Sequence, residues 1–405
     1  MTSKLAVYIR HRLDVSGRDL LFGLAACVRS PDRSDVAENI LHTCSLKDDG
    51  LVCLSVRTGF DLLLRALNWP AGEEVIVSAI THPDMIRIIQ AHGLRAVPVD
   101  VDLETLASSV SSLKAALTPR TKGVFVAHLF GGKMDLEDVL RFVEEQDLLL
   151  IEDCAQAFQG PDNLGDKSSN VSMYSFGPLK TATALGGAVL SVNDTKLLAK
   201  MRFIEQSYPA QGRGEYELKL LKYLALILIS RPIPYGLLVR VCSVFRIDLD
   251  ALVSAMSRSF PPVAQSQFLQ GIRRRPCVPL LSLLNRRLLG FDYKRLARRA
   301  SVGERAARML EPYIELPGLR SQRRTHWIFP VVSPSPGVLV RALKRHGFDA
   351  SYATSNLVAV EAPSSCASPG EADRIMSGVV FLPVYPELPE EALDLLTAVI
   401  TKATA

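Results

Sequence analysis

Short apolar runs alternate with segments of helical spacing through the first half of the chain. The apolar runs, which we expect to form strands, cover residues 51–56, 74–78, 96–99, 124–128, 148–151 and 188–192. The segments between them, which we expect to form helices, cover residues 62–68, 84–92, 135–146 and 194–206. Unbroken apolar runs of this length are typical of strands that are buried on both faces of a parallel sheet. The alternation therefore predicts an α/β fold with a mostly parallel, doubly wound sheet.

The second half of the chain has a different pattern, which predicts a smaller C-terminal α+β domain. Its expected elements are a long basic helix at 285–310, a strand at 325–332, a helix at 336–346 and a last helix from 387 onward. We divide the chain into a first segment without a clear pattern (1–50), a large domain (51–207), an apolar helical insertion (208–268), and a linking helix with the small domain (269–405).

Within the first segment, Ser16 is expected to cap an amphipathic helix. The apolar face of that helix would consist of Leu20, Leu21, Leu24 and Ala25. Ahead of it, the first fourteen residues contain no apolar stretch before their charges, so we expect no signal peptide.

The insertion contains two short apolar segments, residues 218–229 and 237–245, which are separated by Pro232 and Pro234 and surrounded by lysine and arginine. Each is shorter than the roughly 18 apolar residues expected of a membrane-spanning helix. Apolar helices flanked by cations suit the interface of a lipid bilayer. A buried helical hairpin or a subunit interface would give the same pattern, so both interpretations stay open.

The formal net charge of +5 is concentrated in arginines between residues 273 and 324. Aromatic residues do not interleave with these arginines, which argues against nucleic-acid binding. Ligands that carry phosphate, or an anionic membrane surface, fit the basic charge better. The seven cysteines form no CxxC pair, so we expect neither a metal site nor a disulfide framework, and a reduced, cytoplasmic setting.

Two residues point to a specific chemistry. Asp153 follows the apolar run 148–151, and the carboxyl end of a buried strand is where open α/β sheets place their ligands. Lys180 lies among small residues without an acidic neighbour, which is an unusual place for a solubilising lysine. Pyridoxal phosphate requires this pair of groups, because the lysine holds its aldehyde and the carboxylate keeps its pyridine nitrogen protonated.

The motifs around these two residues resemble those of a known family. The blocks EDCAQA (152–157), SFGPLK (175–180) and GGAV (186–189) are similar to the core of the DegT/DnrJ/EryC1/StrS sugar aminotransferases, which are fold-type-I pyridoxal-phosphate enzymes. The resemblance implies that Lys180 and Asp153 are catalytic and bind the cofactor. It also implies that Gln156 hydrogen-bonds the phenolic oxygen of the ring and that Ser175 donates its hydroxyl to the phosphate.

Further cofactor contacts follow from the same resemblance. Thr58, Gly59 and Phe60 occupy the place of the family's Ser-Gly-Thr turn, which we expect to connect a strand to a helix and to bind the phosphate. His82 occupies the place of an aromatic residue that stacks on the ring, although a histidine that caps a helix would fit the same position. Arg273 would replace the asparagine that reaches the phosphate of the neighbouring subunit's cofactor, and a solvated basic helix end is its alternative.

The resemblance implies a homodimeric aminotransferase that moves an amino group, typically from glutamate, to a keto group on a nucleotide-linked or lipid-linked sugar. A related subgroup that dehydrates sugars carries histidine in place of the lysine, so Lys180 argues against that reaction. Two alternatives remain, another fold-type-I reaction and an inert cofactor-binding subunit of a membrane-associated complex. Leu185, where relatives carry glutamate, and Phe60 favour the inert subunit. The apolar insertion adds the expectation of peripheral membrane association in the synthesis of a polysaccharide or glycolipid.

Overall fold

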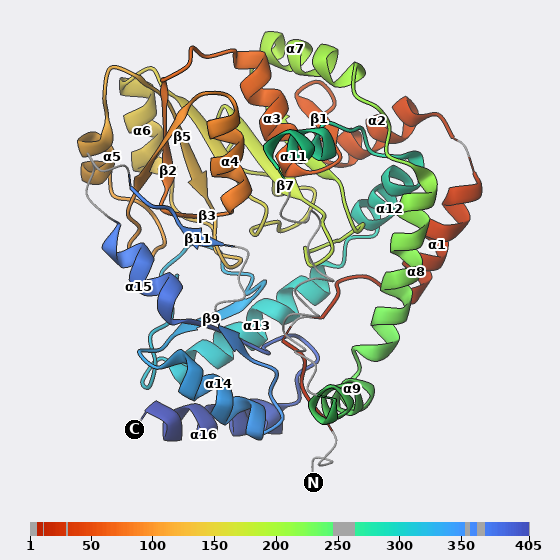
Figure 1. The fold of residues 1–405 in the computed structure, drawn as a ribbon, viewed down its shortest axis with the longest axis vertical. Coiled ribbons are helices and arrows are strands. Elements are labelled where there is room, and N and C mark those ends of the chain that lie inside the picture. Colours follow the sequence, from red (N-terminus) through yellow and green to blue (C-terminus); the bar gives the residue numbers. More distant parts are fainter. Residues whose placement is uncertain are drawn as a thin grey trace.

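A computed structural model describes residues 6–10, 12–29, 31–245, 264–352, 357–362 and 369–404. Its centre is a seven-stranded sheet with the strand order β1–β8–β7–β6–β5–β2–β4 (Figure 1). The strands are β1 (Gly50–Cys53), β2 (Glu74–Ser78), β4 (Arg95–Val99), β5 (Thr121–Ala127), β6 (Leu149–Asp153), β7 (Val171–Ser175) and β8 (Ala188–Val192). Only β8 runs antiparallel to its neighbours in this sheet. The predicted α/β fold with a mostly parallel sheet is therefore confirmed.

Both faces of the sheet are covered, as the unbroken apolar runs predicted. On one face, Val75, Val77 and Ile151 pack against α3 (Val56–Leu67), α4 (Pro83–Ala91) and α7 (Thr195–Gln206). On the other face, Ile76 and Leu150 pack against α5 (Val110–Ala116) and α6 (Glu137–Glu145). Because successive side chains of a strand point to opposite faces, β2 and β6 contribute to both cores.

The first fifty residues form two helices, α1 (Gly17–Val28) and α2 (Arg33–Thr43). Ser16 caps α1 as predicted, in a capping box with Asp19. Leu20 is buried, whereas Leu21 is 56% exposed and Ala25 is also exposed, so the predicted apolar face was wrong at Leu21 and Ala25. The buried face is shifted by one residue because α1 packs against α8 (Arg213–Ile229) and α12 (Val278–Leu289) together.

The predicted long basic helix is two helices. After α12 ends at Leu289, the next helix, α13, runs from Tyr293 to Leu310. Gly290 follows the last residue of α12, and the side chain of Asp292 accepts a hydrogen bond from the backbone N–H of Arg295. A glycine at the end and an aspartate cap at the next start separate the helices.

The small domain has a three-stranded antiparallel sheet in the order β10–β12–β9. Its elements are β9 (Phe329–Val332), α14 (Pro336–Arg345), β10 (Ser351–Tyr352), α15 (Gly370–Gly378), β12 (Val379–Leu382) and α16 (Glu390–Thr404). The helix α13 links it to the large domain and packs against α16. A second link is β11 (Val358–Ala359), which pairs with β3 (Ile80–Thr81) beside the large sheet.

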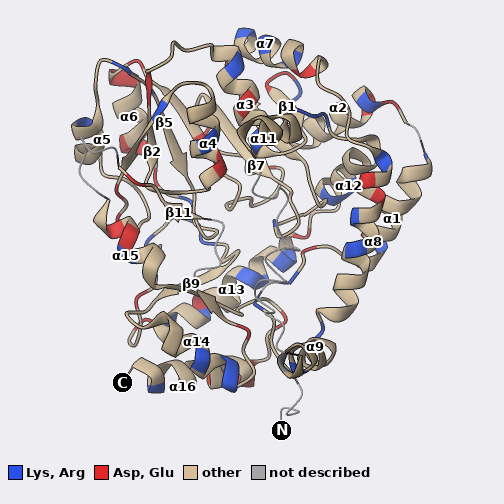
Figure 2. Cartoon of the chain, viewed as in Figure 1, with Lys and Arg blue, Asp and Glu red and all other residues tan. Residues whose placement is uncertain are grey.

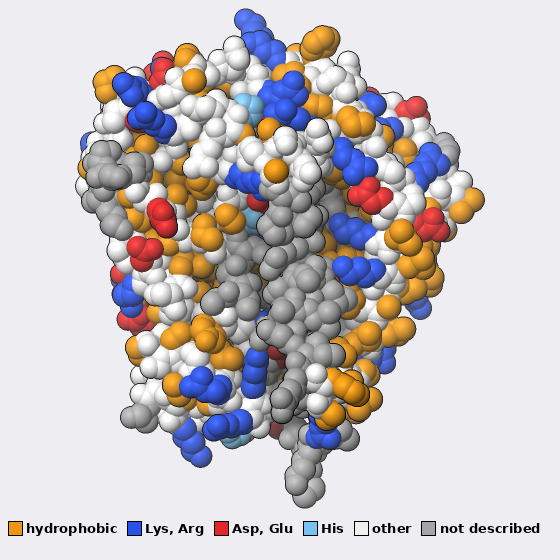
Figure 3. All heavy atoms as spheres, viewed as in Figure 1, with side chains coloured by type: hydrophobic (Ala, Val, Ile, Leu, Met, Phe, Trp, Pro, Cys, Tyr) orange, Lys and Arg blue, Asp and Glu red, His pale blue; other side chains and the backbone are white. Residues whose placement is uncertain are grey.

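The insertion forms α8 and α9 (Pro232–Val244), followed later by α11 (Gln265–Ile272). Its residues 246–263 lie outside the described part of the chain. Large apolar side chains are exposed along the two helices, and Figure 3 shows this flank with lysine and arginine among them. Among the described helices none alone is long and apolar enough to cross a bilayer; α8 and α9 would qualify only as a pair, and that pair is bent by 97°.

Candidate active site

Asp153 ends β6 at the carboxyl edge of the sheet, where the sequence places it. The residue is 8% exposed, and burial raises the pKa of its carboxyl group above the usual value. One carboxylate oxygen accepts a hydrogen bond from the backbone N–H of Ala155 at 2.9 Å. The described residues supply no hydrogen bond to the other oxygen, Oδ2, so this buried carboxylate is only partly satisfied by the chain.

Lys180 lies in the loop between β7 and β8, on the same side of the sheet. Burial lowers the pKa of its amine to about 8, against the opposing effect of Asp153 and with a further lowering by Arg57. Although the two charges influence each other, no ion pair joins Lys180 to Asp153 or to any other described carboxylate. The amine nitrogen instead lies 4.2 Å from the ring centre of Trp327. The structure thus places the two predicted residues close enough to influence each other's pKa, but they form no ion pair.

Trp327 is a site residue that the sequence analysis did not identify. It lies in the segment just before β9, so it reaches the lysine from the small domain. Its indole N–H donates a hydrogen bond to the carbonyl oxygen of Leu179 at 2.8 Å, which fixes the ring beside Lys180. The sequence analysis assigned Trp327 to a strand at 325–332 and so gave it no role in the site. In the structure β9 begins only at Phe329, which leaves Trp327 in the preceding loop.

Gln156 lies three residues after the end of β6, and Ser175 is the last residue of β7. The amide oxygen of Gln156 accepts a hydrogen bond from the backbone N–H of Phe130 at 2.9 Å. This bond orients the amide so that its NH2 group can donate elsewhere. The hydroxyl oxygen of Ser175 lies 3.4 Å from the backbone nitrogen of Gly177. Their contacts with a cofactor stay predictions.

The predicted phosphate turn at Thr58, Gly59 and Phe60 needs correction, because α3 begins earlier, at Val56, with Ser55 as its cap. The hydroxyl of Thr58 donates to the carbonyl oxygen of Ile272 at 2.7 Å, and the N–H of Gly59 donates to that of Ser55. Phe60 is fully buried, with its ring 5.1 Å from that of Phe125. These three residues already have partners within the protein. If a phosphate binds here, it would therefore bind to backbone N–H groups in the first turn of α3.

Arg57, in that first turn, is a second residue that the sequence analysis missed. Its guanidinium forms an ion pair with Asp84 and lies 3.1 Å from Nε2 of His82. Its charge affects the pKa values of Lys180, Asp153 and His82. The available signal was the position of Arg57 directly before the predicted phosphate turn, because a basic side chain beside a helix N-terminus suits an anion.

His82 lies in the site and also caps a helix. Its Nδ1 accepts a hydrogen bond from the backbone N–H of Asp84 at 3.1 Å, at the start of α4. Burial and the charge of Arg57 lower the pKa of the imidazole to about 3, so the ring is neutral at pH 7. Capping was the alternative interpretation of this residue, and stacking on a cofactor ring stays a prediction.

The structure gives Arg273 a different partner from the predicted phosphate. Its guanidinium holds both carboxylate oxygens of Asp61 in the same chain, each at 2.9 Å. Asp61 is fully buried and also contacts His92 and Tyr208. A buried carboxylate requires such compensation, so Arg273 has a structural partner in its own chain. Its role at a neighbouring subunit's cofactor stays a prediction.

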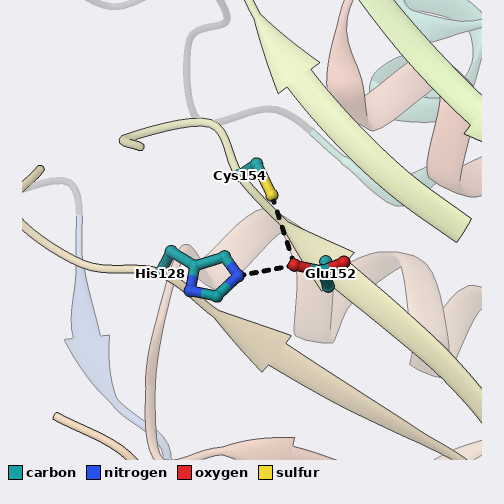
Figure 4. A group of neighbouring side chains, drawn as sticks. All are labelled: His128, Glu152 and Cys154. Atoms are coloured by element: carbon teal, nitrogen blue, oxygen red, sulfur yellow. Dashed lines mark hydrogen bonds and ion pairs between the residues drawn. The ribbon is translucent and has the colours of Figure 1, made fainter. Parts of the chain in front are cut away.

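His128, Glu152 and Cys154 form a buried group, in which Glu152 and Cys154 are the chain neighbours of Asp153 (Figure 4). Nδ1 of His128 accepts a hydrogen bond from the backbone N–H of Met134, so the proton lies on Nε2, which donates to Glu152 at 2.8 Å. The second oxygen of Glu152 accepts bonds from Asp166 and Ser172. The lone pairs of His128 and Glu152 already accept hydrogen bonds within the protein. We therefore interpret the group as a hydrogen-bonded link between the ends of β5 and β6 rather than a metal site.

Comparisons with known proteins agree with the site. Residues 41–220 match the sequence model of the DegT/DnrJ/EryC1/StrS aminotransferase family. The chain is 34% identical over 160 residues to a UDP-N-acetyl-3-dehydro-alpha-D-glucosamine 3-aminotransferase of Acidithiobacillus ferrooxidans, covering 38% of this chain and 42% of that protein. It is 33% identical over 164 residues to GDP-perosamine synthase of Caulobacter vibrioides, covering 40% and 44%. The matched region spans less than half the length of either relative.

The overall fold is similar to solved structures over nearly the whole chain. The aminotransferase TlmJ from Streptoalloteichus hindustanus superposes with a TM-score of 0.70 at 18% identity, covering 98% of both chains. The structure of 3-amino-5-hydroxybenzoic acid synthase gives 0.69 at 18% identity, covering 98% and 99%. At this identity the likeness establishes the fold alone. Residues 41–220, which contain Asp153 and Lys180, are thus similar in sequence to the DegT/DnrJ/EryC1/StrS aminotransferase family.

Proposed function

We propose that this protein is a pyridoxal-phosphate-dependent aminotransferase. The observation that carries the proposal is the relation between Lys180 and Asp153. Asp153 is buried and Lys180 is half-buried, and the two influence each other's pKa, yet they do not pair. A half-buried amine and a buried carboxylate on the same side of a sheet would ordinarily pair, because removing either charge from water is costly. Their separation suits a ring that bonds one at its aldehyde and the other at its pyridine nitrogen.

The residues present fit that cofactor. The oxygen of Asp153 without a protein donor can accept the N–H of a protonated pyridine ring. The NH2 group of Gln156, oriented by Phe130, can donate to a phenolic oxygen. The first turn of α3, with Arg57, suits a phosphate. When bound, pyridoxal phosphate supplies an aldehyde and a ring that withdraws electrons from the substrate carbon.

The protein's own side chains would then transfer protons and limit the access of water. Lys180, with a pKa near 8, is partly neutral at physiological pH and can take a proton from a substrate carbon and return it. Asp153 stays ionised next to a cationic ring, which favours the protonated pyridine. Trp327 covers the lysine from the small domain and limits the access of water.

We infer that the acceptor is a keto sugar and that the donor is glutamate. The two curated relatives are named for a dehydro sugar linked to UDP and for GDP-perosamine, which supports a nucleotide-linked sugar. A lipid-linked sugar remains the second candidate because of the apolar insertion. Single turnovers of purified protein with each acceptor class would separate the two.

The absorbance of the cofactor tests the activity directly. The reconstituted protein should show a band near ~420 nm that bleaches when glutamate is added. The Lys180→Ala protein should lack the band. A protein that binds the cofactor but does not bleach with any amino donor would support the inert subunit instead.

The homodimer that the family resemblance implies belongs to the same proposal. Both domains of one chain contribute residues to the site. A partner subunit would therefore add further residues to a site that one chain already forms. Light scattering coupled to size exclusion should return about twice the chain mass of 44.4 kDa. Full activity from a monomer would exclude the dimer.

Peripheral membrane association through α8 and α9 is a further part of the proposal. Leu218, Leu228, Ile233 and Leu237 are between 58% and 71% exposed on these helices. An apolar surface inserted into lipid contributes about 25 cal/mol per Å2. The neighbouring lysine and arginine side chains would each add roughly 1 kcal/mol on an anionic leaflet.

Flotation with liposomes that contain anionic lipid tests this association at low salt. The intact protein should float, and the double variant Leu228→Glu/Leu237→Glu should not. Phe203→Glu is the matched control, because Phe203 is an equally exposed apolar residue on α7, away from the insertion. If wild type stays with the soluble fraction, the apolar face has a protein partner.

A further inference from the structure

Two buried arginines line the pocket beside Lys180, and they differ in their partners. Arg10 holds both carboxylate oxygens of Asp349, at 2.7 and 3.1 Å. Arg299 is equally buried, at 8% exposed. Its Nε donates to the carbonyl oxygen of Thr325 at 2.9 Å and its Nη1 to the hydroxyl of Thr181 at 3.1 Å. No described carboxylate forms an ion pair with Arg299.

The remaining nitrogen of Arg299, Nη2, is buried and has no hydrogen-bond partner. Burial lowers the pKa of this guanidinium to about 10, so it is still charged at neutral pH. The hydrogen-bond partners of this buried cation are neutral, and the charge of Asp14, which also lines the pocket, offsets the effect of burial only in part. An orphaned buried N–H group is also rare. The group that satisfies both deficits is an oxyanion, since guanidinium binds carboxylate and phosphate oxygens with paired N–H groups.

The position of Arg299 connects this deficit to the candidate active site. Thr181, which Arg299 contacts, directly follows Lys180 in the chain. The pocket that contains Arg299 is also lined by Lys180, Arg12 and Arg295. Figure 2 shows the basic residues of α13 between the two domains. Of the residues expected to hold the cofactor, only Lys180 lines this pocket, so it is separate from the expected phosphate site at α3.

Arg12 and Arg295 are partly compensated and complete the basic lining. They share Glu387, at 3.6 and 2.9 Å, and Arg295 also lies 3.5 Å from Asp14. Their ion pairs are partly exposed, so they can rearrange around an arriving anion at little cost. Arg299, held by Thr181 and Thr325, would stay in place.

We propose that Arg299, supported by Arg12 and Arg295, forms an oxyanion subsite that binds a carboxylate or phosphate group of the substrate next to Lys180. The subsite rests on the proposed aminotransferase function, because it places the anionic end of a substrate whose reacting carbon lies at the lysine. A carboxylate would come from the amino donor, and a phosphate from the acceptor's nucleotide or lipid carrier.

Calorimetric titration of the protein saturated with pyridoxal phosphate tests the subsite without turnover. The two probes are glutarate, a dicarboxylate without an amine, and inorganic pyrophosphate. At least one should bind wild type, and Arg299→Met should weaken that binding at least tenfold. Arg298→Met is the matched control, because Arg298 is the exposed neighbour on the same helix, and its affinity should stay within twofold of wild type. Preference for glutarate assigns the subsite to the donor, and preference for pyrophosphate to the acceptor.

Equal affinity in Arg299→Met and wild type, or no binding of either probe to wild type, would overturn the proposal. If circular dichroism shows that Arg299→Met is unfolded, Arg299→Lys decides. It keeps the charge but loses the paired N–H groups, so at least threefold weaker binding is expected and unchanged binding contradicts the subsite. The loss of the cofactor absorbance band on addition of glutamate is measured in a separate experiment, which tests the aminotransferase function alone. Probe binding without bleaching leaves the subsite standing and removes the aminotransferase function.

Discussion

Two buried aspartates of the large domain have opposite surroundings. Asp61 receives hydrogen bonds from Arg273, His92 and Tyr208. Although burial alone would raise its pKa, the bonds from His92 and Arg273 lower it to about 2. Asp153 receives one backbone N–H, and burial raises its pKa. A carboxylate that the chain fully satisfies serves the fold, whereas one that it leaves incomplete is prepared for a ligand.

The first prediction separates chemistry from stability at the incomplete pair. Lys180→Ala should reduce transamination at least ~10⁴-fold, because it removes both the covalent attachment point and the proton carrier. The free energy of unfolding should change by less than ~1 kcal/mol, since no ion pair is lost. Steady-state rates and urea unfolding measure the two effects, and turnover near the wild-type rate would refute the assignment.

The second prediction concerns Asp153→Asn. The variant should still bind cofactor, but turnover should fall by roughly two orders of magnitude or more, because a neutral partner no longer favours the protonated ring. Rates and cofactor absorbance should be recorded on the same preparation. A variant that merely unfolds would show that Asp153 has the same structural role as Asp61.

The third prediction applies to the compensated cluster. Arg273→Met should destabilise the fold by about 3–5 kcal/mol, because it leaves Asp61 buried without its bidentate partner. Turnover per folded molecule should be retained. Arg274→Met is the matched control: Arg274 pairs with the exposed Glu215, so its loss should cost at most ~1 kcal/mol in urea unfolding. Equal costs for the two variants would contradict the difference drawn between the two aspartates.

The pH dependence of stability extends that test. The folded pKa of Asp61 is depressed from 3.8 to about 2, so its contribution is present above about pH 4 and is lost as the pH falls toward 2. Acid unfolding of wild type should therefore be steeper in this window than that of Arg273→Met. Identical acid profiles would mean that Arg273 does not hold the pKa of Asp61 down.

The smallest effect concerns the amine of Lys180. Because burial lowers its pKa to about 8, the neutral fraction should fall about tenfold for each pH unit below 8. The rate at which the cofactor-free protein regains the absorbance of bound pyridoxal phosphate should follow this fraction, with a midpoint near pH 8. A midpoint near the ordinary value of 10.5 would show that the amine is not buried in the cofactor-free protein.

The sequence predicted the elements that local pattern dictates. The apolar run 148–151 became β6 and delivered Asp153 to the edge of the sheet, and Ser16 capped α1. The sequence-based prediction missed interactions in which a residue's partner lies far along the chain. The pairing of Arg273 with Asp61 was not foreseen, because Asp61 is more than two hundred residues away. Trp327 and Arg299 were missed for the same reason, because each reaches the site from the C-terminal half.

Helix ends were a second source of error. Val56 starts α3 because Ser55 caps it, which removed Thr58 and Phe60 from the predicted turn. The sequence allows that cap, but it equally allows a strand through residue 56, and packing against β8 and α7 decided between them. The break between α12 and α13 had a local signal at Gly290 that the basic pattern obscured.

What the sequence determined by itself is therefore six of the seven strands of the large sheet and the choice of Asp153 and Lys180 as the candidate pair. These follow from hydrophobic spacing and from motifs that are contiguous in the chain. The strand β7 was not among the expected strands. The tertiary structure alone decided which buried charges are satisfied. Asp61 and Arg299 look alike in sequence as charged residues on helices, yet one has three partners and the other an orphaned nitrogen. The cost of burying a charge depends on neighbours brought together by folding, and no local pattern records them.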